Sequence, residues 1–188
     1  MKRVEVDRNY YFSTRDIILM AIFGAIGGLF VITTHFFRLL LPIHFPGLYG
    51  ILYGLAATAF TLIARGLVRK FGAATFTSTI GGLVAFVLPG GPGILVLPMN
   101  IIEGVVIDSF LLLTHREVDD SPLVAAIAGF SPMIFAALFM WWGFKVVFGE
   151  VMPLKIVILI FVGLRGFLAV MGGLIAYIVL VRVRGSIS

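Results

Sequence analysis

Residues 94–114 read ILVLPMNIIEGVVIDSFLLLT, a long apolar run interrupted by three side chains of interest, Asn100, Glu103 and Asp108. A helix needs about 20 consecutive, mostly apolar residues to cross the hydrocarbon core of a bilayer. This stretch therefore predicts a transmembrane helix. Ionisable side chains inside such a helix are energetically costly and often mark a functional site. The same stretch thus indicates both a fold class and a first candidate site.

Apolar runs of comparable length lie on both sides of this stretch. We expect six transmembrane helices, at residues 14–41, 48–66, 71–88, 94–114, 122–148 and 154–183. They leave no room for a soluble domain, so the sequence predicts an all-α, polytopic membrane protein with one integral membrane domain over residues 1–188. The composition agrees, with 61% hydrophobic and 12% charged residues against about 45–50% and about 25% in soluble domains. A soluble enzyme and a nucleic-acid module are excluded.

The formal net charge of +5 is explained by where the basic residues lie. If six helices alternate in direction, ten of the fourteen basic residues fall on one side of the membrane: Lys2, Arg3, Arg8, Arg15, Arg65, Arg69, Lys70, Arg116, Arg182 and Arg184. Cytosolic loops carry the excess of Lys and Arg, so both termini are expected in the cytosol. The connection at 115–121 is expected to be a solvated cytosolic loop, and Asp108 a carboxylate near the cytosolic helix end.

The polar residues within the helices form the first candidate site. Asn100 and Glu103 are three positions apart and share a helix face. At 1.5 Å per residue, Glu103 lies ~13 Å and Arg165 ~15 Å below the outer ends of their helices. Two interpretations stay open at this point. The pair is either a buried ion pair that locks two helices, or a polar site that lines an outward-facing cavity.

Aromatic residues and a histidine gather near the same outer ends, namely Tyr53, Trp141, Trp142 and His44. Such residues commonly form an interfacial aromatic belt. Together with an amide, a carboxylate and an arginine, they also suit a flat, polar heteroaromatic ligand. We expect no metal site, because the three histidines are scattered, and no cofactor. The chain has no cysteine and lacks the GxSxG, HExxH and GxxxxGK[ST] motifs, so it is not expected to be an enzyme.

Small residues four apart mark the first helix. In Ala21-Ile22-Phe23-Gly24-Ala25, preceded by Ser13-Thr14-Arg15-Asp16, Ala21 and Ala25 could serve packing within the bundle or contact with another membrane subunit. With its length and layout, the chain resembles the substrate-capture (S) subunits of energy-coupling factor (ECF) transporters. The resemblance implies that Ala21 and Ala25 dock on a transmembrane coupling (T) subunit driven by two ABC ATPases. It also implies an outward pocket that includes Asn100, Glu103, Trp141, Trp142 and Arg165.

Two segments, Phe12-Ser13-Thr14-Arg15-Asp16 and Val68-Arg69-Lys70-Phe71-Gly72-Ala73-Ala74, are similar to the branch associated with thiamine and its hydroxymethylpyrimidine precursor. A carboxylate of that branch is absent from residues 79–87, so another vitamin or heterocycle stays open. The resemblance implies a multi-pass subunit of a prokaryotic plasma membrane that captures a vitamin-like molecule from outside. The alternatives are a stand-alone carrier or channel with Glu103 and Asp108 as a proton relay, and a structural assembly subunit.

Overall fold

The computed structural model describes residues 12–32, 51–88, 93–147 and 158–186, together with positions 149, 153 and 155. Within these ranges the chain is helical and contains no strand, which confirms the all-α prediction. The elements are α1 (Thr14–Leu29), α3 (Ile51–Val68), α4 (Ala73–Val87), the short 3-10 helix η2 (Gly93–Leu95), α5 (Val96–Thr114), α6 (Pro122–Phe130), α7 (Pro132–Val147), the π-helical segment η3 (Leu159–Arg165) and α9 (Gly166–Gly185).

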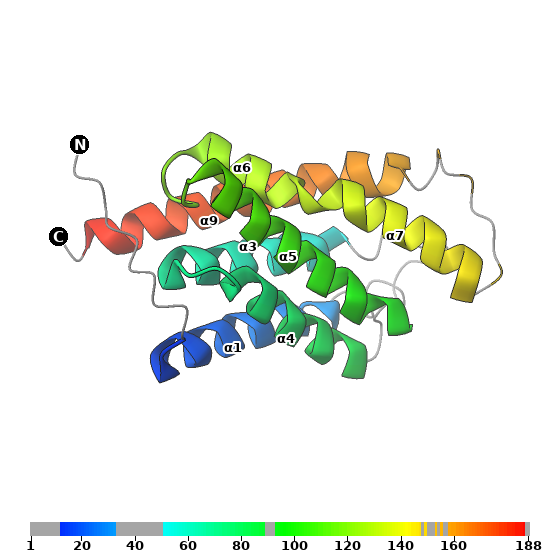
Figure 1. The fold of residues 1–188 in the computed structure, drawn as a ribbon, viewed down its shortest axis with the longest axis horizontal. Helices are drawn as coiled ribbons and strands as arrows, with labels where there is room; N and C mark the ends of the chain where they lie inside the picture. The colour runs from blue at the N-terminus through cyan, green and yellow to red at the C-terminus, as the bar shows by residue number, and fades with distance from the viewer. Residues whose placement is uncertain are drawn as a thin grey trace.

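The helices lie roughly along the long axis of the molecule and alternate in direction (Figure 1). The start of α1 and the end of α9 lie at the same end of the bundle (Figure 1). Arg65, Arg69 and Arg184 meet acidic partners at this end, which we call the basic end. The beginnings of α3, α5 and η3 lie toward the other end, which we call the opposite end. Their arrangement places Tyr53 and Asn100 nearer the opposite end and Asp108 nearer the basic end.

Three described helical segments are long and apolar enough to cross a membrane: Val96–Thr114, Pro122–Gly143 and Val162–Gly185. Tyr53–Val68 and Ala73–Val87 are apolar but shorter. Large apolar side chains also cover the outside of the bundle, including Val87, Leu113 and Leu159, which are 72–80% exposed. So much exposed apolar surface is unusual for a protein surrounded by water.

Glycines bring α4 close to both of its neighbours. A Cβ atom at Gly28 of α1 would lie 2.6 Å from the carbonyl oxygen of Gly81, so α1 and α4 nearly touch there. On the other side of α4, a Cβ at Gly82 would lie 2.9 Å from the Cβ of Asn100 in α5. Small residues allow such close helix approach in membrane bundles. This packing fixes the height and rotation of α5, which carries the candidate site.

Three expected helices differ from the structure. In the region of the helix expected at 14–41, α1 ends at Leu29. Residues 33–41 lie outside the described residues. The helix expected at 122–148 is divided at Ser131 into α6 and α7, because Pro132 has no backbone N–H to continue the ladder. The helix expected at 154–183 includes the π-helical turns of η3, which hydrophobicity does not reveal.

The start of α1 follows its sequence signal. Ser13 is the N-cap, and its hydroxyl accepts a 3.2 Å hydrogen bond from the backbone N–H of Asp16. The Asp16 carboxylate in turn accepts a 3.0 Å bond from the N–H of Ser13, which completes a capping box. Lys70, which follows α3, also donates to the Asp16 carboxylate at 3.0 Å. The N-terminus of α1 is thereby tied to the basic end of the bundle.

Candidate functional site

A buried polar cluster joins α3 to α5 at mid-bundle. The hydroxyl of Tyr53 donates a 3.0 Å hydrogen bond to Asn100 Oδ1, and the hydroxyl of Thr58 donates a 2.8 Å bond to Glu103 Oε1. The Asn100 amide also donates to the Val96 carbonyl one turn earlier, at 2.8 Å. All four of the cluster's side chains, Tyr53, Thr58, Asn100 and Glu103, are buried. Polar groups buried in this way are costly unless hydrogen-bonded. The hydrogen bonds that form where α3 packs against α5 compensate for that cost.

Arg165 approaches this cluster from the end of η3. Its positive charge lies close enough to attract the Glu103 carboxylate, and its guanidinium contacts Met99 Sδ at 3.6 Å. The arginine side chain crosses α3 at Gly54, where a Cβ atom would lie 3.0 Å from Nε. The structure therefore places Glu103 and Arg165 near each other, in line with their similar predicted depth. π-helical turns are frequent at functional sites, and η3 ends at this arginine.

The other predicted site residues lie elsewhere. Trp142 is 53% exposed and packs against Phe139 with ring centroids 6.0 Å apart. Trp141 is partly buried, and Lys145 Nζ lies 6.0 Å from its ring centroid in a cation–π arrangement. His44 lies outside the described residues. Tyr53 is thus the predicted aromatic residue that the structure places in direct contact with the polar cluster.

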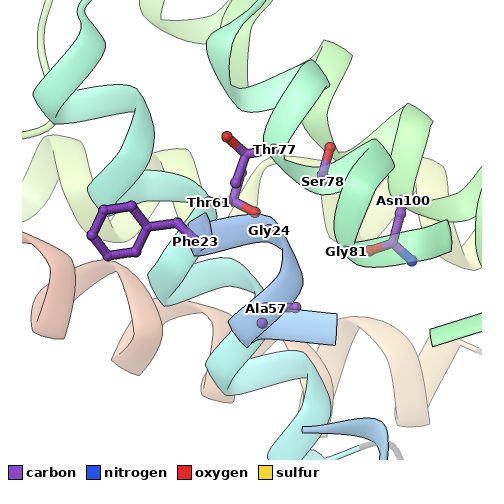
Figure 2. Close-up of a pocket in the computed structure, with 9 residues that line it drawn as sticks. Phe23, Gly24, Ala57, Thr61, Thr77, Ser78, Gly81 and Asn100 are labelled. Carbon is purple, nitrogen blue, oxygen red and sulfur yellow. The ribbon is translucent and has the colours of Figure 1, made fainter. Parts of the chain in front are cut away.

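A small cavity borders the cluster on the side of α1 and α4. The space open to water-sized molecules is about 10 Å³, which is room for about one water molecule. Figure 2 shows Asn100 and Phe23 at opposite sides of this space, with Thr61 and Ser78 also on its lining. The cavity suits water more than a vitamin-sized molecule. A larger pocket would have to involve parts of the chain beyond those that surround this space.

A second buried carboxylate lies at the basic end. Asp108 accepts hydrogen bonds from Thr75 N at 2.9 Å and Thr75 Oγ1 at 2.8 Å. It also accepts from Ala74 N at 3.3 Å and forms a 3.1 Å ion pair with Arg65 Nε. Gly72, the N-cap of α4, has no side chain to cap the helix, so Asp108 of α5 caps it from the neighbouring helix. The Asp108 side chain is 0% exposed, so this carboxylate toward the end of α5 is buried within the bundle.

Ion pairs attach the connection between α5 and α6 to the basic end of the bundle. Arg65 Nη1 pairs with Glu117 at 3.0 Å, Arg69 pairs with Asp119 at 2.8 Å, and Arg184 also pairs with Asp119. Val118 between them is fully buried. Burial raises the pKa of Glu117 above its ordinary value, although the charges of Arg65 and Arg69 oppose this. The expected solvated loop is therefore only partly exposed: His115, Arg116 and Asp120 are exposed, while Val118 and Asp119 are packed because basic residues from α3 and α9 converge there.

Potential metal ligands are sparse around the polar cluster and around Asp108. Within the described ranges, no three His, Cys, Asp or Glu side chains lie close enough together to hold a metal ion. The carboxylates of Asp108 and Asp119 are instead paired with arginines. His115, at the end of α5, is exposed. What the polar cluster offers chemically is one carboxylate, one amide, one phenol and one guanidinium.

The small residues of α1 divide into two sets. Gly24 and Gly28 are buried, and Cβ atoms there would collide with the carbonyl oxygens of Thr77 and Gly81 in α4. Ala21 and Ala25 are only partly buried, and they border the exposed side chains of Ile18 and Ile22. The packing within the bundle is thus supplied by the glycines, while the two alanines remain partly accessible.

An all-helical bundle with an apolar surface and buried charged side chains is typical of an integral membrane protein. Residues 15–135 match the family described as "ABC-type cobalt transport system, permease component", and the chain belongs to this family. It is therefore a transporter component of a membrane and not an enzyme. The fold is similar to the "Crystal structure of an S-component of ECF transporter", with a TM-score of 0.66 and 21% identity over 94% of this chain and 86% of that chain. No curated protein matches the sequence.

Sequence reasoning missed Thr58 and Thr75, the donors that reach the two α5 carboxylates. Thr58, Thr61 and Arg65 follow one another at intervals of three and four residues in an otherwise apolar run. This spacing puts them on one helix face and was the available signal. The partner of each hydroxyl depends on how α3, α4 and α5 are packed, which the sequence pattern alone does not give.

Proposed function

We propose that the chain is the membrane-embedded substrate-binding subunit of an ECF-type importer. The observation that carries this proposal is the buried cluster of Tyr53, Asn100 and Glu103, with the partly buried Arg165 beside it, in an apolar bundle. Charged and amide groups at this depth are costly for a membrane protein to keep. A ligand that exchanges hydrogen bonds with them compensates for that cost. The fold of an S-component, found in the similar crystal structure, supports this proposal.

The proposed orientation puts the basic end in the cytosol and the polar cluster toward the outside. The excess of basic residues at one end supports it through the positive-inside rule. The chain is then a six-helix, multi-pass protein of a prokaryotic plasma membrane with both termini in the cytosol. Because the natural chain has no cysteine, single-cysteine variants at Gly185 and Gly149 can be labelled with an impermeant thiol reagent in intact cells. Labelling of position 185 instead of 149 would contradict this orientation.

The energy for uptake would come from partners. The sequence has no P-loop, so a T subunit and two ABC ATPases are proposed to drive transport. Ala21 and Ala25 are the proposed docking positions, since their partly accessible side chains border exposed apolar residues of α1. A lone carrier that relays protons through Glu103 and Asp108 is a weaker proposal, because Asp108 already accepts four hydrogen bonds.

The proposed substrate is a small, polar heterocycle, with thiamine or its hydroxymethylpyrimidine precursor as the first candidates. Glu103 and Asn100 can accept hydrogen bonds from ring amino groups, and a carboxylate can pair with a cationic ring. Trp141, Trp142 and His44 remain proposed contacts for the rim of the site. A cobalt ion is a second candidate, favoured by the description of the matched family. It would need ligands beyond those that the described residues bring together.

Calorimetric titration of the purified chain separates these substrates. Metal-free protein is titrated with thiamine, with hydroxymethylpyrimidine and with Co²⁺, for the wild type and for Glu103→Gln. We expect one of the two heterocycles to bind, and Glu103→Gln to weaken that binding at least tenfold. Binding of Co²⁺ alone would support the second candidate. Binding of none of the three would contradict both, and heterocycle binding that is unchanged in Glu103→Gln would contradict the proposed site.

A further inference from the structure

We propose that Thr58 is a positioning residue that holds the Glu103 carboxylate in place for a cationic or hydrogen-bond-donating group of the substrate. This inference rests on the proposed function, because it assigns a role to a residue behind the same site. Thr58 belongs to α3 and Glu103 to α5, and the 2.8 Å bond between them is buried. Its donor is a hydroxyl and its acceptor a carboxylate, which makes it one of the stronger kinds of hydrogen bond.

Thr58 and Thr75 each donate to a carboxylate of α5, whereas three other threonines of the bundle bond within their own helices. Thr77, Thr79 and Thr114 each donate to the carbonyl oxygen four residues earlier in their own helix, at 2.7–2.8 Å. This local bond is the ordinary solution for a threonine inside a helix. Thr58 instead donates to a different helix. Its hydroxyl is thus directed toward Glu103 rather than used within α3.

The rest of the Thr58 side chain lies beside one glycine of α6 and one glycine of α9. A Cβ at Gly129 of α6 would lie 3.4 Å from Thr58 Cγ2, and a Cβ at Gly172 of α9 would lie 3.5 Å from Thr58 Cβ. The methyl side of Thr58 therefore lies close to α6 and α9 while its hydroxyl faces α5. A β-branched side chain packed in this way has little rotational freedom, so the direction of the hydroxyl is set by three helices.

The consequence concerns the orientation in which Glu103 meets a substrate. The hydrogen bond from Thr58 fixes Oε1 and therefore defines the orientation of the carboxyl group. The charge of Arg165 attracts the same group. A site with a carboxyl group oriented in this way selects substrates with a cationic ring or amino donors. Thr58 thereby contributes to specificity without needing to touch the substrate.

Matched variants separate the two halves of the Thr58 side chain. Thr58→Val keeps the branched shape and removes the hydroxyl, whereas Thr58→Ser keeps the hydroxyl and removes the methyl group. Thr77→Val is the control, since Thr77 is equally buried but donates within its own helix. The full chain is purified in lipid nanodiscs, and the infrared carboxylate band of Glu103 is identified as the band lost in Glu103→Gln.

We expect Thr58→Val to shift the Glu103 band or exchange it for the carbonyl band of the protonated acid. Thr58→Ser should restore the wild-type spectrum, and Thr77→Val should leave it unchanged. If Thr58→Val does not fold, Thr58→Ala compared with Thr58→Ser gives the same test. A Glu103 band that is identical in Thr58→Val and in the wild type would overturn the proposal. Substrate capture that survives Glu103→Gln would contradict the proposed site, and a wild-type chain that captures no substrate would overturn the proposed function, so the failures are distinguishable.

Discussion

Two buried carboxylates on α5, Glu103 and Asp108, lie five residues apart and have different surroundings. Asp108 accepts hydrogen bonds from Arg65, Ala74 and Thr75, and it caps the start of α4. Glu103 accepts a hydrogen bond from Thr58 and is attracted by Arg165. Burial alone therefore does not identify a functional carboxylate. The groups around a buried carboxylate indicate its role. At Asp108 these groups are the backbone N–H groups that it caps and the arginine with which it pairs at the basic end.

The largest predicted effect is the loss of the Asp108 charge. Asp108→Asn removes one of the two carboxylates paired with Arg65, and removal of one member of a buried ion pair costs up to about 3–5 kcal/mol. We expect a corresponding loss of unfolding free energy in denaturant titration of the detergent-solubilised chain. Asp120 is an exposed carboxylate in the connection between α5 and α6. Its replacement in Asp120→Asn should change stability by less than about 1 kcal/mol. Equal stability of Asp108→Asn and the wild type would remove the structural role assigned to Asp108.

Gly104, one of the four residues between Glu103 and Asp108, should affect both regions. A Cβ at Gly104 would collide with Ser78 and Thr75 of α4, and overpacking of this kind costs about 1–3 kcal/mol. Gly104→Ala should therefore lower the unfolding free energy and also displace Glu103. Gly27→Ala is the control, because its Cβ would lie at an ordinary 3.5 Å from Ala57 Cα. If both variants have the same stability, the close packing of α4 on α5 is not what positions the carboxylates.

A smaller effect is expected at the edge of the polar cluster. Tyr53→Phe removes the hydroxyl that donates to Asn100, and loss of one neutral hydrogen bond costs about 1 kcal/mol. The unfolding free energy should fall by about that amount, as measured by the same denaturant titration. Tyr177→Phe, a tyrosine of α9 partly buried against the core, is the comparison. A fall of 3 kcal/mol or more, on the scale of a broken buried ion pair, would mean that Tyr53 is part of the framework rather than of the site.

The sequence was sufficient for the parts of the fold that depend on local pattern. The apolar runs predicted that the chain is helical, and similar depth indicated that Glu103 and Arg165 lie at one level of the bundle. The cap that Asp108 supplies to α4 could not be predicted, because it depends on which helices pack side by side. The burial of Val118 and the ion pairs of Asp119 could not be predicted for the same reason. Polar residues spaced three or four apart in α3 were the overlooked signal for Thr58.

The smallest effect on stability is expected on the accessible side of α1. The double variant Ala21→Leu and Ala25→Leu changes two partly buried positions, so the unfolding free energy should change by no more than about 0.5 kcal/mol. Co-purification with the T subunit should nevertheless be lost, because the bulky side chains prevent close approach of helices. Ala126→Leu, a partly buried alanine of α6, should keep the complex intact. Persistence of the complex in the double variant would contradict the docking role.

The most direct test of the central claim, that Glu103 serves capture and Asp108 serves the fold, is the small-molecule content of the purified protein. Native mass spectrometry can compare the wild type, Glu103→Gln and Asp120→Asn after purification from cells grown in rich medium. We predict a bound heterocycle in the wild type and in Asp120→Asn, and at least a tenfold lower occupancy in a folded Glu103→Gln protein. Equal occupancy in Glu103→Gln and in the wild type would contradict the account.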